Sequence, residues 1–407
     1  MKKTTLFVFL CVSSFVHAKP QSIVCNSPCC CGFTEQNGIT LYEDKPANGV
    51  FKIHHPDGNL MREISFSKGK KQGVERLFYS NGIMARETHY VQGILDGKDK
   101  QYHQNGVLEQ ETPYKKGLKE GIHKYYSSDG QLREATPYLK GEMEGIQKTY
   151  HGNGRLSNQY PYKKNKIDGT AKSYNQEGQL TWISPHQKGE LEGMEKKYYR
   201  NGQVERETPY MQGKINGTEK SYYENGKLAA EVSYKEGRHD GAMKYYYENG
   251  QLRYEIYYNN EVIEGTKREY RENGALIEET PYVAGKKEGI EKTYDENGTL
   301  KKEIAYKQDD IYFEGGIERN YGKEGVLLRE LKYKTGRPQP SWTETRYRAD
   351  GKAWIKLWIV MGVPQSGTCY AKGGQERALS KETLKDWAFG RPLHSECEMP
   401  PVQWETK

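Results

Sequence analysis

The sequence has little aliphatic material and lacks the short motifs of common enzymes. Hydrophobic residues make up 34% of its 407 residues, too few for one thick core. It has no G-x-S-x-G or H-E-x-x-H motif and no phosphate-binding loop, and its histidines are scattered along the chain. We therefore expect no catalytic residues, no cofactor site and no metal site.

The chain also lacks a strong charge of one sign. Its 62 basic and 55 acidic residues nearly balance, whereas a nucleic-acid-binding protein shows a clustered basic excess. The 33 tyrosines and 44 glycines exclude the aromatic-poor composition of a disordered chain. We expect a thin structure with a tyrosine-lined core and no nucleic-acid partner.

The N-terminus is typical of a secretory signal peptide. Lys2 and Lys3 precede an apolar stretch over residues 5–16, and a small-residue cleavage site ends at Ala18. The apolar stretch is too short to span a bilayer, which argues against an uncleaved anchor. No cysteine follows the small-residue pattern of a lipoprotein signal. We expect cleavage after Ala18 and a periplasmic or secreted protein.

Six cysteines lie beyond this segment, an even number that favours disulfides in an oxidising compartment. We expect Cys369 to pair with Cys397. The other four are expected to pair locally, in a connectivity that the sequence leaves open: Cys25, Cys29, Cys30 and Cys31. A metal site is the alternative for these four, but their spacing matches no standard zinc pattern.

Glycine recurs at a fixed interval of 24 residues through most of the chain. One series is Gly49, Gly73, Gly97, Gly121, Gly145, Gly169, Gly193, Gly217, Gly241, Gly265 and Gly289. A second series runs in step with it, from Gly58, Gly82 and Gly106 to Gly298. A period of this size is typical of a solenoid or array whose units stack on their neighbours.

Other residue types hold fixed places within most units. The third residue after the first glycine is basic and the fifth is aromatic; a Leu, a Glu and a closing Tyr follow the second glycine. In one unit these residues are Lys100, Tyr102, Leu108, Glu111 and Tyr114. Tyrosine-rich runs around Asn-Gly predict two antiparallel strands per unit. The predicted fold is all-β: an elongated, open antiparallel meander of about twelve hairpins, with a small Trp-rich C-terminal cap that contains a short helix.

The turn at the second glycine decides which side chains share a face. A type I turn with glycine in a left-handed bulge is preferred over a type I′ turn, because Glu177 and Glu324 disfavour positive φ. The preferred register places the fifth-position Tyr opposite the Leu, on the face of the closing Tyr, as a core ladder. The basic residues then share that face and the glutamates point away; the type I′ register instead pairs Lys with Glu across the strands.

Prolines precede the closing position in six units, where we expect strand pairing to break: Pro113, Pro137, Pro161, Pro185, Pro209 and Pro281. Between residues 130 and 190 the pattern changes. Ala135, Gln159 and Ile183 replace the Glu in three successive units, Trp182 adds apolar surface, and His186 replaces the closing Tyr. We interpret these five residues as a candidate binding surface, against the alternative of ordinary drift between repeats.

The organisation predicted from the sequence has four parts. They are a signal peptide over residues 1–18, a Cys-rich N-terminal cap over 19–41, hairpin repeats over 42–333 and a Trp-rich C-terminal cap or small domain over 334–407. Ser380 is expected to cap the short helix. Open arrays need capping ends, which accounts for the two terminal segments.

The unit resembles the MORN repeat in its second variant, as found in the YwqK-like antitoxin family. One copy matches position by position at Gly241, Tyr246, Asn249, Gly250, Leu252, Glu255 and Tyr258. The resemblance covers about residues 42–333 and implies a non-catalytic scaffold of antitoxin or immunity type. The signal peptide, high copy number and Trp- and Cys-rich ends depart from that family and argue against a cytoplasmic toxin.

Two functions are consistent with these features. The first is a periplasmic immunity-type protein that occludes a toxin or effector. The alternative is an envelope or surface scaffold that binds lipid head groups, such as an anionic membrane surface, or a glycan or a host protein.

Overall fold

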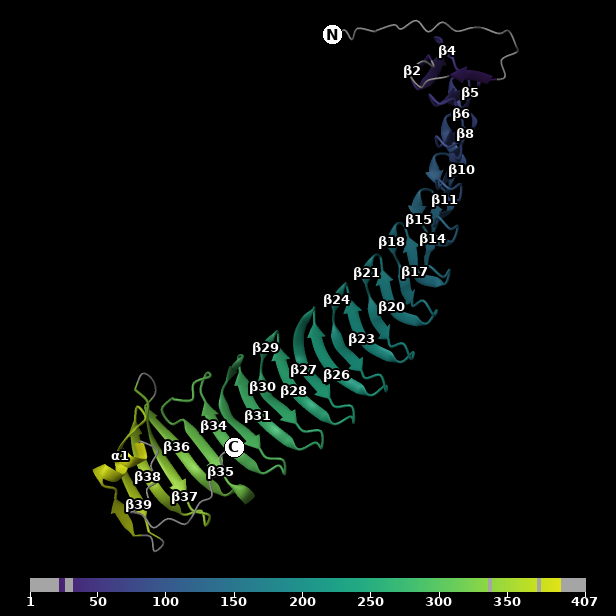
Figure 1. The fold of residues 1–407 in the computed structure, drawn as a ribbon. Helices are drawn as coiled ribbons and strands as arrows, with labels where there is room; N and C mark the ends of the chain where they lie inside the picture. Colours follow the sequence, from purple (N-terminus) through teal and green to yellow (C-terminus); the bar gives the residue numbers. More distant parts are fainter. Residues whose placement is uncertain (1–21, 26–31, 336–338, 372–374, 389–407) are drawn as a thin grey trace, which may run out of the picture. The chain divides into compact units, whose positions relative to one another are not determined.

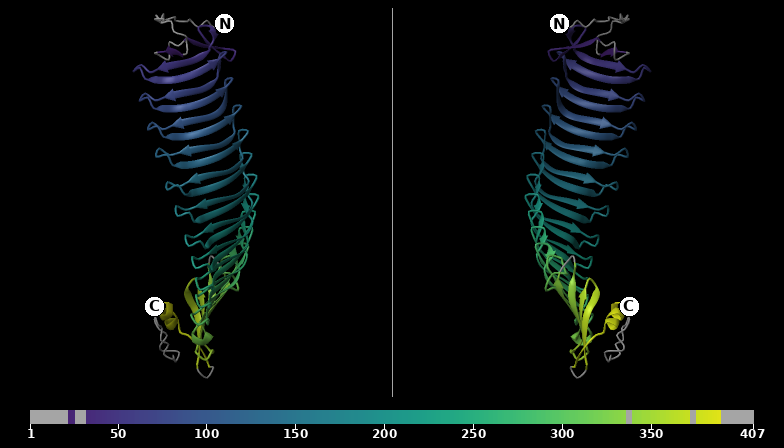
Figure 2. Two further views of the ribbon diagram at one scale, coloured as in Figure 1. Left: turned by 90° about the vertical axis from the view of Figure 1, so that its right-hand side faces the viewer. Right: turned by 90° about the vertical axis from the view of Figure 1, so that its left-hand side faces the viewer.

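A computed structural model describes residues 22–25, 32–335, 339–371 and 375–388. The chain divides into two compact units, residues 1–202 and 203–407. Within each, antiparallel hairpins follow one another in chain order in an open sheet, as predicted (Figures 1 and 2). The predicted signal peptide, Cys29–Cys31 and Cys397 lie outside the described residues, and the predicted domain boundaries stay predictions.

The described residues of the first unit form 22 strands. They are β1 (Ser22–Cys25), β2 (Phe33–Gln36), β3 (Ile39–Tyr42), β4 (Lys45–Pro46), β5 (Gly49–His54), β6 (Leu60–Ser67), β7 (Lys70–Lys71), β8 (Gly73–Phe78), β9 (Met84–Val91), β10 (Ile94–Tyr102), β11 (Leu108–Lys115), β12 (Leu118–Lys119), β13 (Gly121–Tyr126), β14 (Leu132–Leu139), β15 (Glu142–Met143), β16 (Gly145–Tyr150), β17 (Leu156–Lys163), β18 (Lys166–Ile167), β19 (Gly169–Tyr174), β20 (Leu180–Gln187), β21 (Glu190–Leu191) and β22 (Gly193–Tyr198).

The second unit continues the pattern, and a helix is the last element of its described residues. Its elements are β23 (Val204–Met211), β24 (Lys214–Ile215), β25 (Gly217–Tyr222), β26 (Leu228–Lys235), β27 (Arg238–Tyr246), β28 (Leu252–Asn259), β29 (Val262–Ile263), β30 (Gly265–Tyr270), β31 (Leu276–Val283), β32 (Lys286–Lys287), β33 (Gly289–Tyr294), β34 (Leu300–Tyr306), β35 (Ile317–Tyr321), the 3-10 turn η2 (Lys323–Gly325), β36 (Leu327–Thr335), β37 (Ser341–Tyr347), β38 (Ala353–Val360), β39 (Val363–Tyr370), β40 (Glu376–Ala378) and α1 (Lys381–Ala388).

The Asn-Gly turn has the predicted type I geometry with a glycine bulge. In the hairpin of β10 and β11, the Gly106 amide donates to the His103 carbonyl at 2.8 Å, and Gly106 has φ 86°. Asn105 is not among the residues with positive φ, which excludes type I′. Tyr102 lies opposite Leu108, as predicted.

A second bulge corrects the predicted faces. After the Tyr102–Leu108 pair the register shifts, so that Gln101 faces Gln110 and Lys100 faces Glu111. The extra residue between Leu108 and Gln110 reverses the alternation that we expected along β11. The prediction that the glutamates point away from the basic residues was therefore wrong, and so was the prediction that both tyrosines of a unit share a face.

Glu324 is a second correction. We expected this position to avoid positive φ, yet Glu324 has φ 62° within η2. The turn is still closed, because the Gly322 amide donates to the Val326 carbonyl at 2.8 Å. Glu324 and Gly325 both have positive φ, so this turn differs from the Asn-Gly turns earlier in the chain.

The connectors between units are two-residue type I′ turns. Lys116 and Gly117 have φ 51° and 83°, and equivalent pairs recur along the array. Strand pairing toward the following strand is interrupted at the proline that precedes the connector. β11 pairs with β13 at Gln110 and Glu111, the ladder on that side does not include Thr112 and Pro113, and pairing resumes between Tyr114 and β12. The ladder toward the preceding strand runs through Pro113, so the predicted break is confirmed on one side only.

The connector at Ala284 offers a stability prediction. Ala284 has φ 50°, a conformation that L residues other than Asn and Asp rarely adopt. Replacing Ala284 by Asn should raise the free energy of unfolding by about 0.5–1 kcal/mol. The measurement is urea unfolding beside the control Glu272→Asn, at an exposed turn position whose φ is not positive. Equal effects of the two substitutions would contradict the turn assignment.

Side chains at the Asn-Gly turns link each 24-residue repeat to the next. The Asn105 amide donates to the Ser128 carbonyl at 2.8 Å, and Asn153 and Asn249 make the same bond to Gln176 and Glu272. The same asparagines accept a backbone amide two residues on, as Val107 donates to Asn105. Asn therefore recurs because its amide bridges successive turns while its oxygen closes its own turn.

Most of the fully apolar packing lies near the two ends of the array. Phe33 and Tyr42 pack on Phe51 and Phe66 of the first hairpin, and β1 adds in parallel to the edge of β5. In the second unit Trp354, Ile355, Leu357 and Ile359 form a cluster with Leu379 and Leu384.

The predicted C-terminal helix is confirmed. It begins after Ser380, whose hydroxyl accepts the Thr383 amide at 3.1 Å. Cys369 is 4% exposed in the cluster beside this helix. Its pairing with Cys397 stays a prediction, because Cys397 lies outside the described residues.

Candidate functional site

The face that carries the basic residue, the Glu and the fifth-position Tyr of each unit is named here the ladder face. On it, basic and acidic side chains from neighbouring strands form ion pairs rather than the separate columns that we expected. The pairs are Lys52–Glu63, Arg76–Glu63, Arg76–Glu87, Lys100–Glu87, Lys220–Glu231, Arg268–Glu255, Arg268–Glu279, Lys292–Glu279, Arg319–Glu303 and Arg319–Glu330, at 2.9–4.0 Å. Half-exposed pairs of this kind stabilise weakly one by one, but they neutralise the face.

Tyrosine hydroxyls join the same network. Tyr246 donates to Glu231 at 3.1 Å, fifteen residues earlier, and Tyr222 and Tyr294 donate in the same way to Glu207 and Glu279. Burial, and then the hydrogen bond to Glu231, raises the pKa of Tyr246 to about 12. Burial and the carboxylate likewise raise the pKa of Tyr222 to about 12. Glu231 and Glu279 thus accept from a Tyr hydroxyl and also pair with a cation.

These raised values predict alkaline sensitivity. The stability that a tyrosine contributes is complete below its unfolded pKa of 10.0 and is lost as the pH rises through about 12. We expect cooperative loss of β-structure between pH 10 and 12, and a smaller change across that window in Tyr246→Phe. Circular dichroism and tyrosinate absorbance against pH measure this. An absorbance difference between the natural chain and Tyr246→Phe that titrates near pH 10, with both chains still folded, would contradict it.

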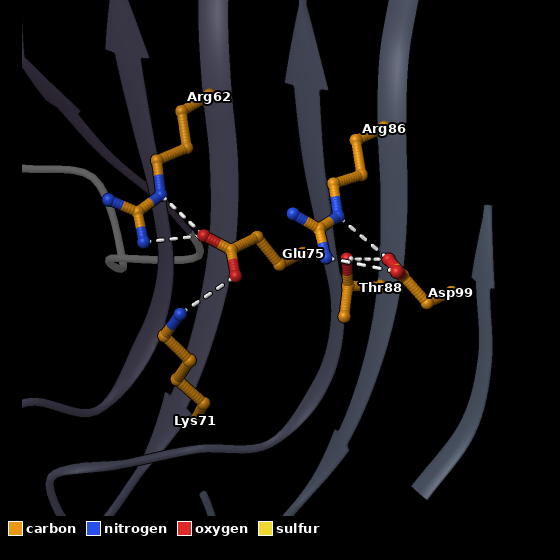
Figure 3. Close-up of polar contacts among 6 residues, drawn as sticks. All are labelled: Arg62, Lys71, Glu75, Arg86, Thr88 and Asp99. Carbon is orange, nitrogen blue, oxygen red and sulfur yellow. Dashed lines mark hydrogen bonds and ion pairs between the residues drawn. The ribbon is translucent and has the colours of Figure 1, made fainter. Parts of the chain in front are cut away.

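The opposite face carries the closing tyrosines and buries polar pairs; it is named here the closing face. Glu75 is 7% exposed and contacts Arg62 at 2.6 Å and Lys71 at 2.8 Å (Figure 3). Burial alone would raise the pKa of Glu75, but the Lys71 hydrogen bond and the Arg62 charge outweigh it, so this pKa is lowered.

The next repeat of the closing face repeats the arrangement. Asp99 is 4% exposed and accepts two bonds from Arg86, at 2.8 and 2.9 Å, and one from the Thr88 hydroxyl at 2.7 Å (Figure 3). Further along, Ala171 and Ser184 occupy the equivalent places, both fully buried. The groups that contact these carboxylates are side chains of the fold itself, so we interpret the buried acids as structural.

The ladder face changes between Ala135 and Ile183. Lys148 lies between Ala135 and Gln159 on the neighbouring strands, and Lys172 lies between Gln159 and Ile183. Neither lysine amine has an ion pair or hydrogen bond among the described residues, and Lys148 is exposed. In contrast, Lys244 keeps Glu231 and Glu255 opposite it. Three substitutions therefore leave two cations without a carboxylate on either side.

The predicted binding residues divide between the two faces. Ala135, Gln159 and Ile183 lie on the ladder face, whereas Trp182 and His186 lie on the closing face, because they occupy alternate positions of β20. The His186 ring bonds the Ser184 carbonyl at 3.0 Å. The structure brings the first three together and separates the other two from them.

An apolar stripe beside the lysines was missed from the sequence. Ile122 and Ile146 are 50% and 51% exposed and lie opposite Pro137 and Pro161. Each isoleucine follows the first glycine of its unit, two residues before a ladder-face lysine, so it lies on the same face. The signal was present in the sequence, because this position of the repeat is apolar in some units, as at Ile122 and Ile146, and polar in others, as at Thr170 and Thr218.

The described part of the chain has a hollow but no cluster of metal-ligating side chains. No group of three His, Cys, Asp or Glu side chains there could hold a metal ion. Among the same residues, no helix is long and apolar enough to cross a membrane. A hollow of about 390 Å³ on the closing face is lined by Tyr245, Arg253, Tyr254 and Glu269.

Comparison with known proteins agrees with this geometry. The MORN repeat variant family matches ten segments, which together cover more than half of the chain: residues 47–68, 71–92, 95–116, 119–140, 143–164, 191–212, 215–236, 240–260, 263–284 and 287–308. The chain belongs to the MORN repeat variant family. No matched segment falls between residues 164 and 191, the stretch that contains Trp182 and Ile183.

Other comparisons add little to the MORN assignment. No curated protein matches the chain. Among solved structures, the crystal structure of TcdB2-TccC3-TEV is 11% identical; the match covers 84% of this chain and 21% of that one. Its TM-score of 0.17 is too low to support an argument about fold or function.

Proposed function

We propose that this MORN-repeat chain is a non-catalytic scaffold of immunity type, which binds and occludes a toxin or effector protein in the periplasm. MORN repeats suggest a scaffold with a binding role. The observation that carries the proposal is the loss of charge pairing on the ladder face between Ala135 and Ile183. Ion pairs neutralise many basic residues of the ladder face, but Lys148 and Lys172 have no carboxylate opposite them. A partner protein is able to supply acidic side chains to these two lysines.

The ladder face is suited to covering a partner protein because its side chains lie on a fixed backbone. Each strand of the ladder face is hydrogen-bonded to both neighbours, so its side chains are presented on a fixed backbone and lose little freedom on binding. Tyrosine and exposed apolar side chains, which favour protein interfaces, lie beside the free lysines at Tyr150 and Ile146. A partner seated on this surface would have its own active surface covered.

Co-expression tests this function. The product of the neighbouring gene, directed to the periplasm, should arrest growth, and this chain should restore growth and co-purify with that product. A variant without residues 2–18 is the matched control, because it should fold but stay in the cytoplasm and fail to rescue. Absence of both rescue and co-purification would refute the immunity role.

A second candidate is an envelope scaffold that contacts anionic lipid head groups through the same lysines. Its support is the surplus of positive charge at Lys148 and Lys172. Such binding would be salt-sensitive. Co-sedimentation with vesicles of anionic lipid at low and high salt tests it, and vesicles of neutral lipid serve as the control.

A further inference from the structure

We propose that the ladder face from β13 to β19 binds an extended acidic segment of the partner protein, with an acidic residue at about every third position. The inference rests on the proposed function, because it names the part of the partner that the scaffold holds. Lys124, Lys148 and Lys172 form the binding row; Lys124 is its end member, with Glu111 opposite it on one side and Ala135 on the other. They occupy equivalent positions on β13, β16 and β19.

Charge complementarity identifies the ligand as acidic. At several other positions on this face a Glu from a neighbouring strand pairs with the basic residue, as Glu231 pairs with Lys220 at 3.4 Å. Lys148 and Lys172 have Ala135, Gln159 and Ile183 in those places. An acidic side chain from a partner would occupy the position from which the scaffold's own carboxylate is missing.

A tyrosine hydroxyl is released by the same substitutions. Tyr246 donates to the Glu fifteen residues before it, whereas the residue in that place for Tyr150 is Ala135. Tyr174 still donates, to the Gln159 amide oxygen at 3.3 Å. Tyr150 thus adds a hydroxyl donor beside the Lys148 amine, and carboxylates accept both kinds of donor.

Spacing identifies the segment as extended. Successive lysines of the row are separated by two strand spacings, or about 9.6 Å. In a polyproline II segment, residues three apart lie on the same side and are separated by about 9.3 Å. Acidic residues at every third position would therefore meet Lys124, Lys148 and Lys172 in turn.

A protein segment fits this surface better than a membrane. The row is a single file of cations, whereas recognition of an anionic membrane uses clusters of about four to eight basic residues. Ile122 and Ile146 lie along one side of the row, opposite Pro137 and Pro161. These apolar side chains are placed to contact the residues between the acids of one extended chain.

The test measures fluorescence anisotropy of a labelled peptide with the repeat Glu-Pro-Pro against the full mature chain. We expect salt-sensitive binding that weakens at least about tenfold when the same residues are rearranged with all glutamates contiguous. The decisive variant restores the missing acids as Ala135→Glu and Gln159→Glu. It should reduce affinity by about tenfold or more while slightly raising thermal stability, because Lys148 and Lys172 become paired.

The matched control is Thr218→Glu combined with Thr266→Glu, which adds the same charge to exposed or half-exposed ladder-face positions outside the row. It should leave affinity within about twofold at moderate salt. Equal weakening by both double variants, or binding to anionic vesicles but not to the peptide, would overturn the proposal.

The two proposals fail in different ways. Peptide binding without rescue in the co-expression experiment would leave the acidic site standing and remove the immunity role. The opposite result has two parts: the Ala135→Glu, Gln159→Glu variant still rescues growth, and the natural chain does not bind the peptide. That result would support the immunity role and refute the acidic-segment site.

Discussion

Replacing Phe51 by Ala should lower the free energy of unfolding by about 4 kcal/mol, the largest effect expected of any single change in the first unit. Phe51 is 1% exposed and contacts the rings of Phe33, Tyr42 and Phe66 at centroid distances of 4.9–5.7 Å. The truncation leaves a cavity that this small cluster is poorly able to fill. Because array units contact mainly their neighbours, the damage should centre on residues 33–67.

Hydrogen exchange with mass spectrometry, together with urea unfolding, measures both parts of this prediction. Exchange should quicken in β2–β6 and change little in the second unit. Tyr257→Ala is the control, since Tyr257 is 39% exposed and its loss should destabilise by less than about 1 kcal/mol. A Phe51→Ala chain as stable as this control would contradict the packing described.

Replacing Glu344 by Ala should lower the free energy of unfolding by about 3 kcal/mol. Glu344 is 1% exposed and accepts from Arg329 at 3.0 and 3.1 Å and from Arg346 at 2.8 Å. Its removal leaves two guanidinium groups without their shared carboxylate. The loss stays near the lower end for a buried pair, because the arginine side chains are 39% and 24% exposed and water compensates in part.

The same carboxylate predicts the direction of an acid effect. Burial would raise the pKa of Glu344, but the hydrogen bond and charge of Arg329 outweigh burial and lower this pKa. Its stabilisation is therefore complete above the ordinary value of 4.5 and is lost as the pH falls through the lowered folded value. Thermal unfolding of the natural chain and Glu344→Gln should converge as the pH drops below 4.5; a constant difference would contradict the assignment.

Much of the fold was predictable because the same short turn signal recurs in many copies. One Asn-Gly between tyrosines is a weak signal, but the same turn at 24-residue intervals predicts an array of hairpins. Glu177 was informative about the turn type, since its side chain disfavours the positive φ of a type I′ turn. The residues opposite the turn, Tyr102 and Leu108, followed from that choice.

The faces were not predictable, because one extra residue reverses the alternation of a strand. The bulge between Leu108 and Gln110 has no Gly to mark it in the sequence, where Glu109 occupies the extra position. Its effect is that Lys100 and Glu111 meet, the outcome that we had assigned to the alternative turn. The buried polar pairs of the closing face, such as Arg86 with Asp99, were hidden for the same reason.

The candidate site was found in part. Loss of Glu at Ala135, Gln159 and Ile183 is visible in the sequence, but its consequence depends on the register that places Lys148 and Lys172 between them. Trp182 attracted attention as a large apolar residue, yet it lies on the other face from these three. Composition located the stretch, and only strand pairing separated its two surfaces.

The most direct test of this account is the reactivity of individual lysines toward an acetylating reagent, with and without the Glu-Pro-Pro peptide. Mass spectrometry should show that the peptide protects Lys148 and Lys172 and leaves Lys220 and Lys292 unchanged, since the latter are held by Glu231 and Glu279 at 3.4 and 3.2 Å. Equal protection of all four lysines, or protection only of the paired ones, would contradict the claim that the interrupted ion-pair ladder is the binding surface.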